Sequence, residues 1–295
     1  MRVTFRTAYG GIEYVNTAAD QLAKARHQLA SGKRVEKPSD DPAAMQRAIE
    51  GRAEMRTIET YTRTSDSALA KISTLDTVLS GVIDKLQQAT VSAASVRGSI
   101  ATQHQRDAAA LALEGLRDSL AADLNTQFRG SYVFGGSESG TVPFAQVAGV
   151  WTYQGDNAPV SVDIGAGRSV EIALDGQALA QGTDANNVLN DLETLIVAVR
   201  AGDNAGIDTG RAALDRAFSR ATSTQSQIGV DEAGITDTQS QLTSTRLSLL
   251  ARVAKDEDAD LAGAITEMTR ADAAYRAALA AVGNASNNSL LDYLR

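Results

Sequence analysis

The stretch "ISTLDTVLSGVIDKLQQATVSAASVRGSI", residues 72–100, indicates the fold class of this chain. Its apolar side chains recur at alternating steps of three and four residues, at Ile72, Leu75, Leu79, Val82, Leu86, Ala89, Ala93, Val96 and Ile100. This is the spacing of a coiled-coil seam, in which each apolar side chain packs against a facing helix. The pattern predicts one helix from about Ala43 to Ile100, roughly 85 Å long at 1.5 Å per residue.

Apolar stripes at helical spacing recur on both sides of this stretch. They predict further helices over residues 12–29, 111–128, 187–199, 214–228 and 235–282. The last of these is expected to begin after Gly229 and Gly234. Helices with such narrow stripes are marginal alone, so they should pack against one another or against other copies of the chain. We expect residues 72–100 to pack against residues 111–128 and 235–253.

The middle of the chain has a different pattern. Glycines recur from Gly130 to Gly182, and apolar residues alternate in steps of two over residues 160–174, on either side of a Gly-Ala-Gly turn. This alternation predicts a β-hairpin, and "VWTY" at 150–153 predicts a further short strand. The sequence therefore predicts a mainly α fold: an elongated multi-helix coiled-coil bundle of N- and C-terminal segments, with a small β-rich domain inserted in the middle.

Composition excludes several classes of function. The 295-residue chain has a formal net charge of -8, which argues against non-specific nucleic-acid binding. It has no cysteine and therefore neither disulfides nor thiolate ligands. No apolar run approaches the roughly 20 residues of a membrane span. The N-terminal segment "MRVTFRTAYG" lacks the apolar region of a secretory signal, so we expect no cleaved signal peptide.

No catalytic or metal-binding constellation stands out. His27 and His104, the only histidines, lie in polar helical stretches and are expected at the surface. The segment 256–267 has acidic residues at positions 1, 3, 5 and 12 of a calcium-binding loop. Position 6, however, is Leu261, where the sharp turn of that loop needs glycine. We therefore expect no metal, no cofactor and no enzymatic activity.

The stretch "SGKRVEKPSDDPAAM", residues 31–45, lies between two predicted helices and is expected to form a hinge. Gly32 can end the first helix in the left-handed conformation, and Pro38 should keep the connector extended. Asp41 can cap the next helix by accepting from the amide of residue 43 or 44, with Pro42 at the first helical position. Asp40 would add negative charge at the positive end of that helix.

The two chain ends carry opposite charge. Residues 1–35 are net positive and residues 256–295 are net negative. Opposite charge on two amphipathic segments favours their pairing and helps to set its register. The alternative is ordinary solvated charge, which contributes little.

Three segments resemble the bacterial flagellin superfamily. "LASGKRVEKPSDDPAA" at 29–44 resembles the stretch that follows the first helix in flagellins and their hook-junction relatives. "DEDADLAGAITEMTRADAAYRAALAAVGNASNNSLLDYLR" at 256–295 resembles the C-terminal helix of the family. "NTQFRGSYVFGGSESGTVPF" at 125–144 resembles the exit from the helical domain in the junction members. This exit motif consists of Gly130, Tyr132, Phe134, Gly135, Gly136, Pro143 and Phe144.

The resemblance implies a structural adaptor that joins hook to filament at the hook–filament junction. Flagellin, the bulk filament subunit, is one alternative, and a secreted coiled-coil tip or translocator protein is another. The implied partners are like subunits in a ring, another hook-associated protein on the hook side, flagellin on the filament side, an export chaperone and the flagellar type III export apparatus. Neither nucleic acid nor membrane insertion is implied. The implied location is the extracellular flagellum.

The resemblance also implies three domains. Residues 1–41 and 255–295 would form an inner coiled coil, residues 42–130 and 184–254 a helical middle domain, and residues 131–183 a β-rich outer insertion. The inner assembly contacts would be made by Ile12, Val15, Leu22, Leu29, Leu261, Ile265, Met268, Tyr275, Leu279, Val282, Leu290, Leu291 and Leu294. An intramolecular core is the alternative role for these side chains.

Overall fold

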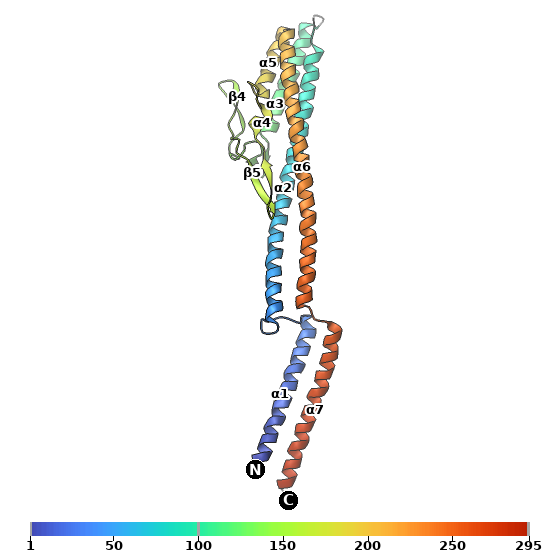
Figure 1. The fold of residues 1–295 in the computed structure, drawn as a ribbon. Helices are drawn as coiled ribbons and strands as arrows, with labels where there is room; N and C mark the ends of the chain where they lie inside the picture. Colours follow the sequence, from blue (N-terminus) through green and yellow to red (C-terminus); the bar gives the residue numbers. More distant parts are fainter. Residues whose placement is uncertain (1, 99–100, 294–295) are drawn as a thin grey trace. The chain divides into compact units, whose positions relative to one another are not determined.

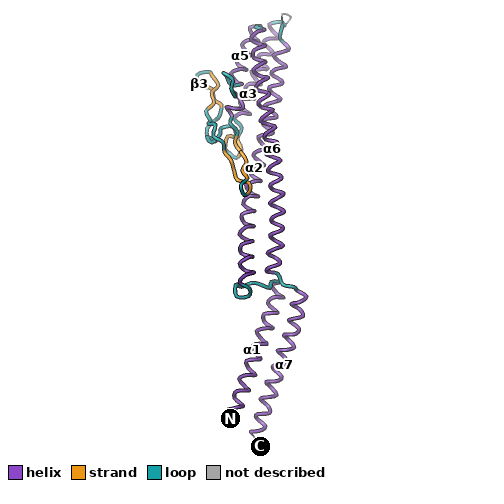
Figure 2. The backbone as a smooth tube through the Cα atoms, in the orientation of Figure 1, coloured by secondary structure: helices purple, strands orange, loops and turns teal. Residues whose placement is uncertain are grey.

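The computed structural model describes residues 2–98 and 101–293. Its contacts divide the chain into two compact units, one made of Met1–Thr57 with Ser244–Arg295 and the other of Ile58–Thr243. Helices make up most of both units, and short strands occur only in the second of them within the described ranges (Figure 2). The predicted mainly α fold with a small β-rich insertion is confirmed. The division into three domains remains a prediction.

The first unit contains the two chain ends. Helix α1 (Arg2–Ser31) lies beside α7 (Leu261–Tyr293), as Figure 1 shows. The unit also contains the first turns of α2 (Pro42–Ser95) and the last turns of α6 (Asn204–Glu257). The buried apolar side chains between the described parts of α1 and α7 are three alanines and one leucine, at Ala18, Leu22, Ala25 and Ala271.

The second unit is a helical bundle that carries the strands. The remaining parts of α2 and α6 run antiparallel, because Gln239 donates to Asp66 at 2.9 Å while Gln225 donates to Asp76 at 3.0 Å. Helix α3 (Gln103–Leu124) packs on α5 (Val188–Ala201), and the short α4 (Gly176–Ala180) precedes α5. One apolar core joins these helices and includes the predicted seam from Ile72 to Val96.

Three antiparallel strand pairs lie between α3 and α4. They are β1 (Gln127–Phe128) with β2 (Ser131–Tyr132), β3 (Phe144–Val147) with β4 (Val150–Tyr153), and β5 (Val160–Gly165) with β6 (Arg168–Ala173). The predicted hairpin and the strand at 150–153 are therefore confirmed. Strand β4 is fixed to α5, because Asn187 donates to the Trp151 carbonyl at 2.8 Å and Asn190 accepts from the Trp151 amide at 3.0 Å.

The predicted ends of three helices were wrong. Helix α6 continues through Gly229 and Gly234, and the break expected there falls instead at residues 258–260. A glycine inside a helix costs about 1 kcal/mol, but Ile228 and Ile235 on either side are both buried in the core, so packing keeps the helix continuous. At the actual break, Asp260 accepts from the amide of the second residue of α7 and caps that helix.

Helices α2 and α3 also end earlier than predicted. Helix α2 ends at Ser95, five residues before the expected end at Ile100, which lies outside the described residues. Phe128 lies in β1 and not in the third helix, because Asn125 ends α3 and donates to the carbonyl of Phe144 at 2.8 Å. None of the described helices combines the length and apolarity of a membrane span.

Candidate assembly site

The connector between α1 and α2 has the local structure of a capped break. Gly32 has φ of 68° and donates its amide to the Gln28 carbonyl at 2.9 Å, which ends α1. Pro42 is the first residue of α2. Asp41 accepts from the amide of Ala44 at 3.0 Å, in the N-cap geometry that the sequence predicts.

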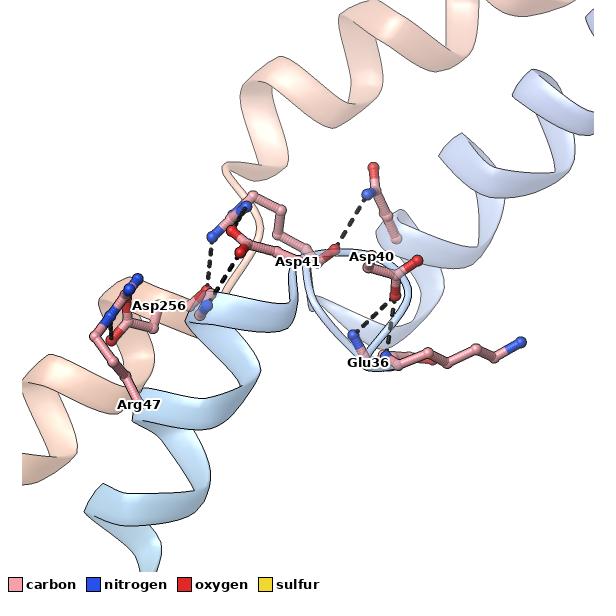
Figure 3. A network of polar contacts seen from close by, with 9 residues as sticks. Glu36, Asp40, Asp41, Arg47 and Asp256 are labelled. Atoms are coloured by element: carbon pink, nitrogen blue, oxygen red, sulfur yellow. Dashed lines mark hydrogen bonds and ion pairs between the residues drawn. The ribbon is translucent and has the colours of Figure 1, made fainter.

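Two connector residues behave differently from the prediction. Asp40 does not face the end of α2; its carboxylate accepts from the amides of Glu36 at 3.2 Å and Lys37 at 3.0 Å (Figure 3). Pro38 does not extend the connector. It is the second residue of a tight turn that the Asp40 amide closes onto the Lys37 carbonyl at 2.9 Å. Proline suits this position because the fixed φ of its ring matches the turn, and aspartate readily accepts from nearby amides.

Ion pairs connect this segment to the end of α6. Arg47 donates to the carboxylate of Asp256 through two nitrogens, at 2.6 and 3.1 Å (Figure 3). Arg34 donates to the Asp256 carbonyl at 2.8 Å and to Asp41 at 3.3 Å. The sequence presents Asp256 as one negative charge of the C-terminal segment and as the first residue of the calcium-like segment, and it gives no signal for Arg47. No local pattern could have joined them, because the partners are 209 residues apart.

The connector carboxylates are stabilised in their charged form. The amide of Lys37, followed by that of Glu36, holds the pKa of Asp40 below its usual value. The amide of Ala44, followed by Arg34, lowers the pKa of Asp41, and the Arg47 guanidinium lowers that of Asp256. A carboxylate whose pKa is lower in the folded state stabilises that state above the unfolded pKa. This contribution is lost as the pH falls through the folded pKa.

We therefore expect acid to loosen the connector. Between pH 5 and pH 2, amide exchange in residues 33–47 should rise relative to that in the buried α2 core, as measured by hydrogen–deuterium exchange corrected for intrinsic rates. Asp41→Asn keeps a capping oxygen but cannot titrate, so it should match the wild type at pH 7 and show a weaker pH dependence. An equal pH dependence in the variant would contradict the role of Asp41.

The structure pairs the two end helices but leaves much of the predicted assembly stripe uncovered. Leu22 is buried, while the half-buried members are Val15, Leu29, Met268, Tyr275 and Val282. The exposed members, 46–53 % accessible, are Ile12, Leu261, Ile265 and Leu279. Leu290 and Leu291 lie in the part of α7 whose side chains are not described, and Leu294 lies outside the described residues. Large exposed apolar side chains in a row are typical of protein–protein interaction surfaces.

Ion pairing contributes little to the stability of the α1–α7 pair. Arg26 of α1 lies 3.6 Å from Asp272 of α7, and both side chains are partly exposed. Exposed ion pairs are worth about 0–1 kcal/mol. The opposite charges of the chain ends therefore assist the pairing without accounting for it.

The exit motif is part of the packed core of the second unit. Phe134, Pro143 and Phe144 are buried, and the ring of Phe144 lies 5.2 Å from that of Tyr153 between centroids. Tyr132 is half-buried in β2. The motif's glycines lie in tight backbone turns: Gly130 and Gly136 have φ of 83° and 63°, and Gly135 lies against the Glu138 carbonyl. These positions explain why the motif needs small and aromatic residues.

Within the described residues, no group of acidic, histidine or cysteine side chains could hold a metal ion. The acidic residues of the calcium-like segment have other roles: Asp256 pairs with Arg47, and Asp260 caps α7. His27 is exposed, with its Nδ1 3.4 Å from Glu36.

Comparison with known proteins supports the flagellar resemblance. The family model of the bacterial flagellin N-terminal helical region matches residues 11–139. Flagellar hook-associated protein 3 of Escherichia coli is 29% identical over 218 residues, 68% of each chain. Flagellin of Bacillus subtilis is 23% identical over 296 residues, 95% of this chain and 94% of that one.

A solved structure shows the same fold. The putative flagellar hook-associated protein from Vibrio parahaemolyticus superposes with a TM-score of 0.71 at 19% identity, covering 74% of this chain and all of the other. The family model covers the resembling segment at residues 29–44 and most of the one at 125–144. The chain is thus similar to the bacterial flagellin superfamily, and its relatives include hook-associated protein 3 members.

Proposed function

We propose that this chain is a structural adaptor subunit at the hook–filament junction of a bacterial flagellum. The observation that carries the proposal is the paired helices α1 and α7, whose apolar residues Ile12, Leu261, Ile265 and Leu279 remain about half exposed. The helix pair leaves these side chains accessible, and further copies of the chain would cover them in an assembly. The similarity to hook-associated protein 3 supports the junction, rather than the filament, as the place of assembly.

The partners follow from this position. Like subunits would form a ring, another hook-associated protein would adjoin it on the hook side, and flagellin would adjoin it on the filament side. To reach an extracellular junction, the subunit would pass through the flagellar type III export apparatus with the help of a chaperone, without losing a signal peptide. The role is that of a building block and involves no catalysis.

Deletion of the gene from its source bacterium tests the junction role. Cells should assemble hooks without attached filaments and release flagellin into the medium, which electron microscopy and immunoblotting would detect. Immunogold should place the wild-type protein at a single point just beyond the hook. Labelling along the whole filament, or loss of flagellin itself, would instead identify the chain as flagellin.

Complementation with point variants tests the exposed stripe. Ile265→Glu adds a charge where the side chain is 50% exposed, so the folded chain should lose at most about 0.5 kcal/mol while assembly fails. Arg270→Glu places a glutamate at another exposed position of α7, with a larger change of charge, and should still restore filaments. Full filament attachment with Ile265→Glu would exclude this face from the assembly contact.

A further inference from the structure

Glu257, the last residue of α6, is buried although it carries a carboxylate: its side chain is only 4% exposed. Its carbonyl accepts from the connector amides of Arg34 at 2.7 Å and Val35 at 3.2 Å. Next to it, Lys33 and Asp258 form an isolated antiparallel bridge, and the Ala259 amide donates to the Gly32 carbonyl at 2.9 Å. The break after α1 and the break before α7 are thus hydrogen-bonded to each other.

The Glu257 side chain adds an ionic link at the same place. One carboxylate oxygen accepts from Lys33 in the connector at 3.2 Å and from the guanidinium of Arg52 on α2. The other oxygen, Oε1, is buried without a hydrogen-bond partner in the structure as described. Burying a carboxylate is costly even when it is paired, and an unsatisfied oxygen adds to the cost. A residue chosen for stability alone would be apolar here, which points to a positional role.

Helices α1 and α7, which flank this contact, need such a positional element. Between the described parts of α1 and α7, the buried apolar side chains are three alanines and Leu22, and larger ones such as Val15 and Tyr275 are only half-buried. The register of a coiled coil is defined by large apolar side chains that insert between those of the facing helix. A stripe of alanines buries nearly the same apolar area when one helix shifts along the other. The ion pair between Arg26 and Asp272 is partly exposed and weak. Packing alone therefore specifies the register of α1 against α7 poorly.

We propose that Glu257 is a positioning residue that sets the register of α1 against α7, by tying the break after one helix and the break before the other to Arg52 of α2. The register in turn decides which apolar side chains face outward together. The proposal concerns the folded chain and does not rest on the flagellar function.

Distance measurements between two spin labels test the proposal on the full chain. Because the chain has no cysteine, labels can be attached at cysteines introduced at the exposed positions Lys24 and Arg270. The wild-type background should give one narrow distance by double electron–electron resonance. Glu257→Gln keeps the shape of the side chain and removes its charge. It should broaden the distribution about twofold or more, because a slip of one heptad moves a label by roughly 10 Å.

Two further variants make the result decisive. Glu267→Gln removes an exposed carboxylate from α7 and should leave the distribution narrow. Lys33→Gln removes one cation partner from the connector without altering a helix, so it should broaden the distribution even if Glu257→Gln disturbs folding. A narrow distribution in both Glu257→Gln and Lys33→Gln would overturn the proposal, and so would a broad one in the wild type. Neither outcome bears on whether the chain assembles at the junction.

Discussion

Replacing Leu79 with aspartate should lower the free energy of unfolding of residues 58–243 by roughly 4 kcal/mol or more. The Leu79 side chain is fully buried in the seam of α2, in the same core as Leu75 and Leu86. The substitution removes the apolar contacts of one leucine and places a carboxylate in a core where none of the buried residues described is a cation. Losses of this size have few causes, and a buried unpaired charge is one of them.

Urea unfolding followed by circular dichroism would measure this loss. Ser80→Asp introduces the same charge at the adjacent exposed position and should change stability by no more than about 0.5 kcal/mol. If Leu79→Asp cost as little as its neighbour, the seam would face solvent and the assignment of the core would be wrong.

The seam shows what could be predicted from sequence. Its apolar residues recur with a helical period, and the structure buries those from Ile72 to Val96 in the core. The cap at Asp41 and the left-handed residue Gly32 were equally predictable, because each acts on residues a few positions away. Interactions between residues only a few positions apart can be predicted from a short stretch of sequence.

The ends of α6 were not predictable in the same way. Glycine propensity favours a break at Gly229 and Gly234, but the decisive factor is the burial of Ile228 and Ile235 against other helices. The packing of α3 against α5 likewise depends on tertiary contacts, because the apolar stripe of a helix does not indicate which other helix will cover it.

The contacts made by Glu257 were not predicted from the sequence for a related reason. Its partners Lys33 and Arg52 are more than 200 residues away in sequence, and a single glutamate at the end of a helix resembles ordinary surface charge. The sequence contains two signals: the opposite net charges of residues 1–35 and 256–295, which do not identify individual partners, and the acidic segment 256–267, which resembles a calcium-binding loop. In the folded chain Asp256 instead pairs with Arg47, and Asp260 caps α7. Glu257 pairs with Lys33 and Arg52.

Gly136→Ala should be the most damaging single-methyl change in the exit motif. Gly136 has φ of 63°, and a Cβ at this position would lie 2.2 Å from the Asp156 carbonyl oxygen and 2.3 Å from Asp156 Oδ1. Asp156 cannot easily move away, because its carboxylate accepts from the Ser137 amide at 2.6 Å and its carbonyl lies 2.8 Å from the Tyr153 hydroxyl. Burial raises the pKa of that tyrosine to about 12, so its hydroxyl keeps its proton at neutral pH.

We expect Gly136→Ala to cost roughly 2–4 kcal/mol, as the sum of a strained backbone conformation and a steric clash. Two glycines of the same loop separate these causes. Gly130 has φ of 83° with open space around it, so Gly130→Ala should show the backbone cost of about 1 kcal/mol alone. Gly140 has neither feature, so Gly140→Ala should be neutral. Urea unfolding of the three variants should rank them in this order; equal stability of Gly136→Ala and Gly130→Ala would show that Asp156 yields and that the clash does not explain the motif.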